Sequence, residues 1–94
     1  MEFAFDAEVW YWRGPSPFHF VTVPLQDAEL IVALAPTLSY GWGCVPVRAR
    51  VGATAFTTSL IPHDGGYVVP LKAAVRAAEG IGVGDVASVA LEVG

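Results

Sequence analysis

The chain has 94 residues, of which 54% are hydrophobic and 15% are charged, and nine Asp and Glu side chains outnumber five Lys and Arg for a net charge of −4. We expect one folded domain rather than a disordered tail, and no apolar run reaches the roughly 20 residues of a membrane-spanning helix. The excess of negative charge disfavours nucleic acid and anionic membranes as partners.

Alternating apolar and polar side chains over residues 2–12 predict the first strand. Its apolar face carries Phe3, Phe5, Ala7, Val9 and Tyr11. Trp10 and Trp12 therefore project from the opposite face. Glycine and two prolines in residues 13–17 end this strand, and residues 18–23 predict the second. The acidic start lacks the basic and apolar segments of a secretory signal, so we expect a cytoplasmic protein.

The next elements are a helix and a strand. Residues 26–35 predict the helix, which Pro36 ends because proline supplies no N–H to the helical ladder. The apolar side of this helix comprises Ala28, Ile31 and Ala35, joined by Leu30 and Leu34. Valine or alanine at every second position predicts a strand over residues 45–51, with Arg48 and Arg50 on its solvent face.

Two further strands follow in the second half of the chain. Gly52 turns the chain into a strand over residues 54–60, and Asp64-Gly65 forms the next turn, because these residue types suit its backbone angles. The strand after that turn ends near Val69.

Pro70 and Gly80 are typical of the first turn and the end of a helix. The apolar side of this second helix comprises Leu71, Ala74, Val75 and Ala78. Gly84, which we expect to adopt a positive φ, turns the chain into the last strand. One face of that strand is uniformly apolar and carries Ala87, Val89, Leu91 and Val93.

The two predicted helices begin with a matching signature. Val23-Pro24-Leu25 with Ala28 matches Val69-Pro70-Leu71 with Ala74. We interpret the chain, residues 1–94, as a single domain of two halves, residues 1–52 and 53–94, each in the order strand, strand, helix, strand. Half a chain of this size cannot bury its sheet, whereas two halves can close one barrel, so we expect a monomer.

Several short stretches spread along the chain form a recognisable set: Phe20-Val21-Thr22-Val23-Pro24, Gly41-Trp42-Gly43, Thr57-Thr58-Ser59-Leu60, Asp64-Gly65, Val75-Arg76 and Gly84-Asp85. The set resembles the DUF1905 family of bacterial proteins, which has no known function. Residues 70–89 are also similar to the swapped-hairpin DNA-binding domains of the AbrB and MazE type, where proline, lysine, a Val-Arg pair and a Gly-Asp turn recur.

These resemblances imply an architecture but no activity. In the swapped-hairpin proteins two subunits supply the two halves of the barrel, and here one chain would supply both. We expect a mostly β fold with two short α-helices: a six-stranded, pseudo-two-fold β-barrel of the double-split type, capped by the helices, in ββαβ-ββαβ order.

Residue types for catalysis and metal binding are sparse. Ser59, His63 and Asp64 supply the components of a nucleophilic triad, but their adjacency in sequence favours a structural role around the Asp64-Gly65 turn. Cys44 stands alone, which excludes an internal disulfide and a thiolate zinc site, and we interpret it as a small buried side chain. The glycines at 80, 82 and 84 follow a helix, whereas a phosphate-binding loop precedes one. We expect no metal and no cofactor.

Basic side chains offer one candidate site. Lys72 and Arg76 lie one helical turn apart, and with Arg48 they form a candidate for anion binding. The alternative is a solvated helix face on which Arg76 pairs with Glu79.

Aromatic side chains are abundant, with three Trp, three Tyr and five Phe. The exposed face of the first strand is either packed shut by other elements or part of an aromatic-lined cleft formed by Trp10, Trp12, His19, Tyr40 and Trp42. We expect a non-enzymatic binding module that takes a small molecule or a peptide in this cleft. The alternatives are a DNA-binding regulator similar to AbrB, which the net charge disfavours, and an enzyme of unrecognised type.

Overall fold

A computed structural model of the chain describes residues 1–15, 17–38 and 43–94. In this part of the chain there are seven strands and two helices, in the order β1 (Glu2–Glu8), β2 (Trp10–Trp12), β3 (Phe18–Thr22), α1 (Leu25–Leu38), β4 (Val45–Val51), β5 (Thr54–His63), β6 (Gly66–Pro70), α2 (Ala73–Glu79) and β7 (Val86–Val93). The mostly β class with two helices is therefore confirmed.

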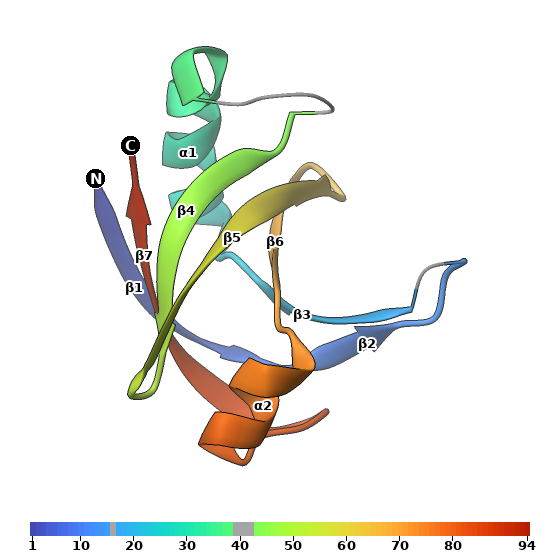
Figure 1. Ribbon diagram of the computed structural model, residues 1–94. Helices are drawn as coiled ribbons and strands as arrows, with labels where there is room; N and C mark the ends of the chain where they lie inside the picture. The colour runs from blue at the N-terminus through green and yellow to red at the C-terminus, as the bar shows by residue number, and fades with distance from the viewer. Residues whose placement is uncertain (16, 39–42) are drawn as a thin grey trace.

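The strands form one antiparallel sheet in the order β1-β7-β4-β5-β6-β3-β2. The sheet curls into a half-barrel, with α1 and α2 at opposite ends of it (Figure 1). Six strands were expected and seven are found, and the double-split barrel is not confirmed. Neither helix within the described residues is long and apolar enough to cross a membrane.

The additional strand arises because the predicted first strand is interrupted at Val9. The Val9 N–H donates to the Asp85 carbonyl at 2.9 Å, and the Val9 carbonyl accepts from the Gly84 N–H at 2.9 Å. These bonds tie the chain to the turn before β7, and β2 then leaves β7 and pairs with β3. The bend also reverses which face is inside, so Tyr11 is 38% exposed and does not continue the apolar face of β1.

The strands of residues 1–52 and 53–94 pair in corresponding ways. β1 pairs with β7 and β2 with β3, while the first seven residues of β5 pair with β4 and its last three with β6. In each half, the first stretch of strand (β1, or the start of β5) thus pairs with the last strand of the other half. The stretch that follows it (β2, or the end of β5) pairs with the second strand of its own half. The pairings β3–β6 and β4–β7 complete the connection between the halves.

The core lies on the concave side of the sheet. β4 and β7 show strict alternation of buried and exposed residues, as the sequence predicts. α1 contributes Ala28 and Ile31, which are 1% and 0% exposed, but Leu30 is 51% exposed, so its expected place on the apolar side is wrong. α1 also continues past Pro36 to Leu38. Proline's fixed φ of about −65° is itself helical, and near a helix end it removes a single hydrogen bond.

The start of α2 also differs from the expectation. Pro70 is the last residue of β6, and the helix begins at Ala73 after Lys72. Leu71 and Val75 are buried as expected, whereas Ala74 and Ala78 are exposed, because a helix this short presents little more than one turn to the sheet. Gly80 ends the helix in the left-handed conformation (φ 63°), as predicted.

Candidate functional site

An aromatic cluster lies on one face of the β2–β3 hairpin. The hairpin register places Trp10 opposite Phe20 and Trp12 opposite Phe18, so their four side chains project from the same face. The Trp10 and Phe20 ring centroids are 5.4 Å apart, and those of Phe18 and Phe20 are 5.6 Å apart. Phe20 is buried (8% exposed) and the other three are half-buried, so the cluster is neither fully packed nor fully open.

His63 adds a fifth ring to this cluster. Its ring centroid lies 5.5 Å from that of Trp10 and 5.1 Å from that of Trp12. His63 is held there by a two-residue turn in which Asp64 and Gly65 both have positive φ (54° and 80°). This is the turn that Asp64-Gly65 predicts, and it brings the end of β5 against the hairpin.

The two indoles of the cluster have different environments. Trp10 Nε1 donates a 2.9 Å hydrogen bond to Thr22 Oγ1, which fixes the ring against β3. The indole of Trp12 lies over Gly14, where a Cβ atom would stand 1.5 Å from Trp12 Nε1. Glycine at this position therefore leaves room for the indole beside the hairpin. We conclude that Trp10 is fixed against β3 and that Trp12 forms the open side of the cluster.

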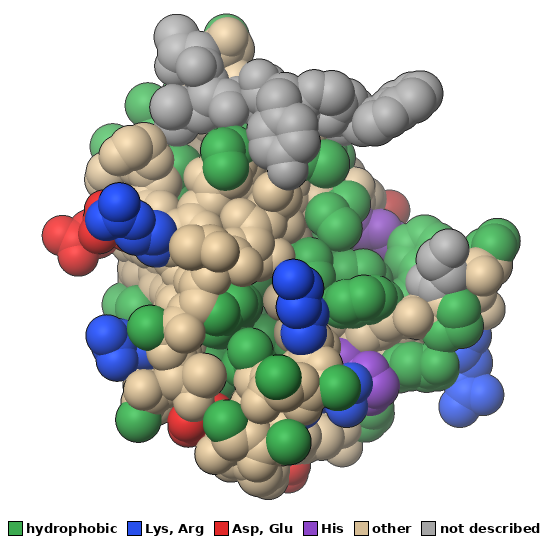
Figure 2. Space-filling view, in the orientation of Figure 1, with side chains coloured by type: hydrophobic (Ala, Val, Ile, Leu, Met, Phe, Trp, Pro, Cys, Tyr) green, Lys and Arg blue, Asp and Glu red, His purple; other side chains and the backbone are tan. Residues whose placement is uncertain are grey.

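A cleft of about 820 Å³ opens beside Trp12. Its wall is mainly apolar and includes Trp12, Pro15, Phe18, Phe20, Ile61 and Pro70. Thr58, Ser59 and Lys72 supply polar groups, and Cys44, half-buried and not fully buried as expected, completes the lining. We call this the aromatic cleft. In the space-filling view, hydrophobic side chains gather between the β2–β3 hairpin and the rest of the sheet (Figure 2).

His19 lies on the other face of the hairpin. It stands opposite Tyr11 in the register, with ring centroids 4.8 Å apart, and Arg13 lies 5.9 Å above the Tyr11 ring. The structure thus separates His19 from Trp10 and Trp12, with which the sequence grouped it. Tyr40 and Trp42, the other two members of that predicted group, lie outside the described residues.

His19 instead lines a second cleft, of about 380 Å³, together with Lys72 and Arg76. We call it the basic cleft. Leu71 connects its two sides: the Leu71 N–H donates to the His19 carbonyl at 2.9 Å, and the Leu71 carbonyl accepts from Arg76 Nε at 3.2 Å. Burial, and secondly the charge of Arg76, lower the pKa of His19 below its ordinary value of 6.5.

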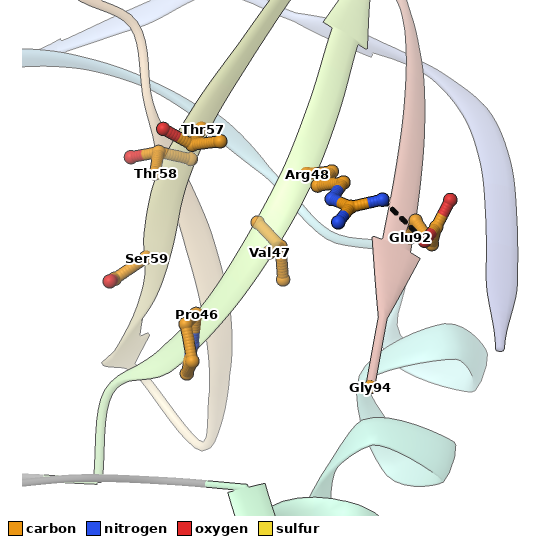
Figure 3. Close-up of a pocket in the computed structure, with 8 residues that line it drawn as sticks. All are labelled: Pro46, Val47, Arg48, Thr57, Thr58, Ser59, Glu92 and Gly94. Carbon is orange, nitrogen blue, oxygen red and sulfur yellow. Dashed lines mark hydrogen bonds and ion pairs between the residues drawn. The ribbon is translucent and has the colours of Figure 1, made fainter.

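Arg48 belongs to a different part of the surface. It lines a cleft of about 520 Å³ between β4, β5 and β7, and its side chain extends toward Glu92 and away from Thr58 and Ser59 (Figure 3). Arg48 Nη1 and Glu92 Oε1 are 3.4 Å apart, and the two residues are direct partners in the β4–β7 register. The charge of Arg48 is thus partly neutralised. Of the three cations in the predicted anion site, the structure brings together Lys72 and Arg76 but not Arg48.

Several cleft residues escaped the sequence prediction. Phe18 and Phe20 match the pattern of any buried strand face, so nothing in the pattern marks them as cleft residues. Ile61 and Pro70 belong to elements distant in sequence from the hairpin. The alternation of residues 18–20 was the available signal, since it places Phe18 and Phe20 together on the face that Trp10 and Trp12 share once β2 pairs with β3. The described residues contain no group of three or more His, Cys, Asp or Glu placed to hold a metal ion.

The model of one family, described as a domain of unknown function (DUF1905), matches residues 5–91. The match includes both strands of the β2–β3 hairpin, α2 and most of β7. No curated protein matches the chain.

Proposed function

The chain belongs to the DUF1905 family, and we propose that this member binds a small molecule with a planar apolar ring in its aromatic cleft. The observation that carries the proposal is the cleft itself, which has a volume of about 820 Å³ and a mainly apolar wall. Ligand-binding pockets typically enclose ~300–1,000 Å³ and combine an apolar lining with a few polar groups, which is the composition seen here.

The aromatic side chains favour a ring-shaped ligand. Trp12, Phe18 and Phe20 line the cleft, and aromatic side chains prefer stacked or edge-to-face contact with another ring. The rings of Trp10 and His63 pack against Phe20 and Trp12, so these side chains lose little conformational entropy when a ligand binds. Thr58 and Lys72 provide polar contacts at the margin of the cleft.

Binding to DNA is less well supported. The described Lys and Arg side chains lie in separate groups over the surface (Figure 2), and Arg48 is paired with Glu92. A duplex-binding face requires several cations on one side to replace counterions along the phosphate backbone, and the chain as a whole carries a net charge of −4.

The proposal is tested with 2-naphthol, a neutral two-ring probe. In two-dimensional NMR, the indole N–H of Trp12 and the backbone amides of Phe18 and Thr58 are expected to shift saturably as 2-naphthol is added. Alkylation of Cys44 by iodoacetamide is expected to slow in parallel, because Cys44 lines the same cleft. Agreement of these two measurements locates the probe independently of any single tryptophan.

Trp12→Ala removes the open wall of the cleft and is expected to weaken 2-naphthol binding about tenfold or more. Leu30→Ala is the matched control, because Leu30 is a large exposed apolar side chain (51%) on α1 and does not line the cleft. The proposal fails if 2-naphthol shifts no amide of the cleft residues, or if Leu30→Ala weakens binding as much as Trp12→Ala does.

A further inference from the structure

The aromatic cleft and the basic cleft are adjacent. Both are lined by Phe18 and Lys72, so a molecule that occupies one reaches the margin of the other. Phe18 lies at one end of the aromatic cluster, opposite Trp12 in the hairpin register, and Lys72 lies just before α2. Between them the character of the surface changes from apolar rings to basic groups.

The basic cleft concentrates positive charge on an acidic protein. It contains Lys72, Arg76 and His19, and the described residues that line it include no Asp or Glu. The nearest acidic residue in sequence on α2 is Glu79, whose carboxylate is occupied elsewhere: it accepts hydrogen bonds from Thr54 Oγ1 at 2.5 Å and from the Ala53 N–H at 3.3 Å. The expected Arg76–Glu79 pair is therefore not formed, and Arg76 is not neutralised by its helix neighbour.

Arg76 is positioned for recognition of an anion. Its Nε donates to the Leu71 carbonyl at 3.2 Å, which fixes the guanidinium beside β3. Within the described ranges its two terminal amino groups, and the ammonium of Lys72, have no protein partner. A guanidinium anchored in this way retains the paired donors that match a carboxylate or a phosphate, and Lys72 adds a second charge from the shared margin.

We propose that the two clefts form one composite site for a small ligand that carries both a planar apolar ring and an anionic group, with the ring in the aromatic cleft and the anion held by Lys72 and Arg76. The proposal rests on the proposed function for its aromatic half. His19 completes the polar wall of the basic cleft. Because its pKa is lowered, its imidazole is mainly neutral near pH 7, and the neutral ring offers one N–H donor.

The test compares two probes that share a ring system. 2-Naphthol is neutral at pH 7, and 2-naphthoate carries a carboxylate at the same ring position. The net charge of −4 opposes the anion at long range, so tighter binding of 2-naphthoate requires a local basic site. We expect a dissociation constant about tenfold lower for 2-naphthoate than for 2-naphthol in calorimetry at low salt, and a smaller ratio at high salt.

Lys72→Gln is the principal variant, because the Lys72 side chain is exposed and makes no capping bond to α2. It is expected to remove most of the preference for 2-naphthoate, which is measured as the ratio of the two dissociation constants, so that any effect of Lys72 on the ring's own cleft is divided out. Arg76→Gln is expected to act in the same direction, but it also breaks the bond to Leu71, so its thermal unfolding is measured first. Arg50→Gln is the matched control, because it removes the same charge from an exposed residue of β4 outside both clefts.

The possible outcomes separate the two proposals. If 2-naphthol binds and 2-naphthoate binds no more tightly, or if Lys72→Gln and Arg50→Gln lower the preference equally, the composite site is wrong and the aromatic cleft stands. If neither probe binds, both proposals are wrong. Preference for 2-naphthoate that Lys72→Gln removes and Arg50→Gln preserves establishes the composite site.

Discussion

Glu79, at the end of α2, accepts a 2.5 Å hydrogen bond from the Thr54 hydroxyl at the start of β5. The same carboxylate accepts from the Ala53 N–H and lies against Gly52, where a Cβ atom would stand 1.9 Å from Glu79 Oε1. One side chain thus closes the β4–β5 turn from outside and ties the second helix to the sheet. The φ of +57° at Gly52 favours glycine, and the absence of a side chain there leaves room for the carboxylate.

Removing this contact is expected to loosen the β4–β5 turn. Glu79→Gln and Thr54→Val should each lower the free energy of unfolding by about 1 kcal/mol, as expected for a hydrogen bond to a carboxylate at a half-buried position. A double-mutant cycle in urea denaturation measures the coupling between the two residues. Strictly additive effects would contradict a direct Thr54–Glu79 interaction.

Gly84→Val tests the turn that holds the interruption at Val9. Gly84 has a φ of +93°, and a Cβ there would meet no atom within 4 Å, so the expected loss of about 1–3 kcal/mol comes from backbone strain alone. Gly82→Val is the matched control, since this glycine is equally open but its φ is not positive. Equal thermal stability of the two variants would show that the turn tolerates a β-branched residue.

Much of the fold could be predicted from the sequence, because it is set by local patterns. Strict alternation in residues 45–51 and 86–93 predicted β4 and β7, and Asp64-Gly65 predicted a turn that the backbone angles confirm. The interruption at Val9 could not be predicted in this way. Its cause is a pair of hydrogen bonds to a turn more than seventy residues later, and the alternation of side chains continues through the break.

The candidate site was less predictable than the fold. Trp12 was identified from the strand pattern, but the walls of the aromatic cleft outside the β2–β3 hairpin come from Cys44, β5, β6 and the residue before α2, which no local pattern connects. His19 was grouped with the indoles in one expected cleft. The β2–β3 register places it on the opposite face, where it joins Lys72 and Arg76.

We expect the protein to be a monomer in solution. The pairings β1–β7, β3–β6 and β4–β7, which join the two halves, are all made within one chain, so exchange of hairpins between subunits is not needed to complete the sheet. Light scattering at micromolar concentration should report a mass near 9.9 kDa. A stable dimer would contradict this expectation, and the exposed Leu25, Leu30 and Val32 of α1 would then be the first surface to examine.

The titration of His19 reports directly on the basic cleft. Because its pKa is lowered in the folded protein, the unfolded chain binds the proton more readily, so the contribution of His19 to stability is present above pH 6.5 and is lost as the pH falls through the folded pKa. The groups that face it are Tyr11 on β2, Lys72, and Arg76 on α2. Arg76→Gln removes the second cause of the shift and is expected to raise the pKa of His19 toward its ordinary value.

Proton NMR of the His19 ring measures this titration, with His63→Gln used to assign the two histidine signals. Arg50→Gln is expected to leave the His19 titration unchanged, since Arg50 lies outside the basic cleft. Saturating 2-naphthoate should raise the pKa of His19 in the wild type, because an anion beside the ring stabilises the imidazolium, whereas 2-naphthol should not raise it. If the two probes move the pKa equally, the anionic group does not lie in the basic cleft, because the effect then follows the ring and not the charge.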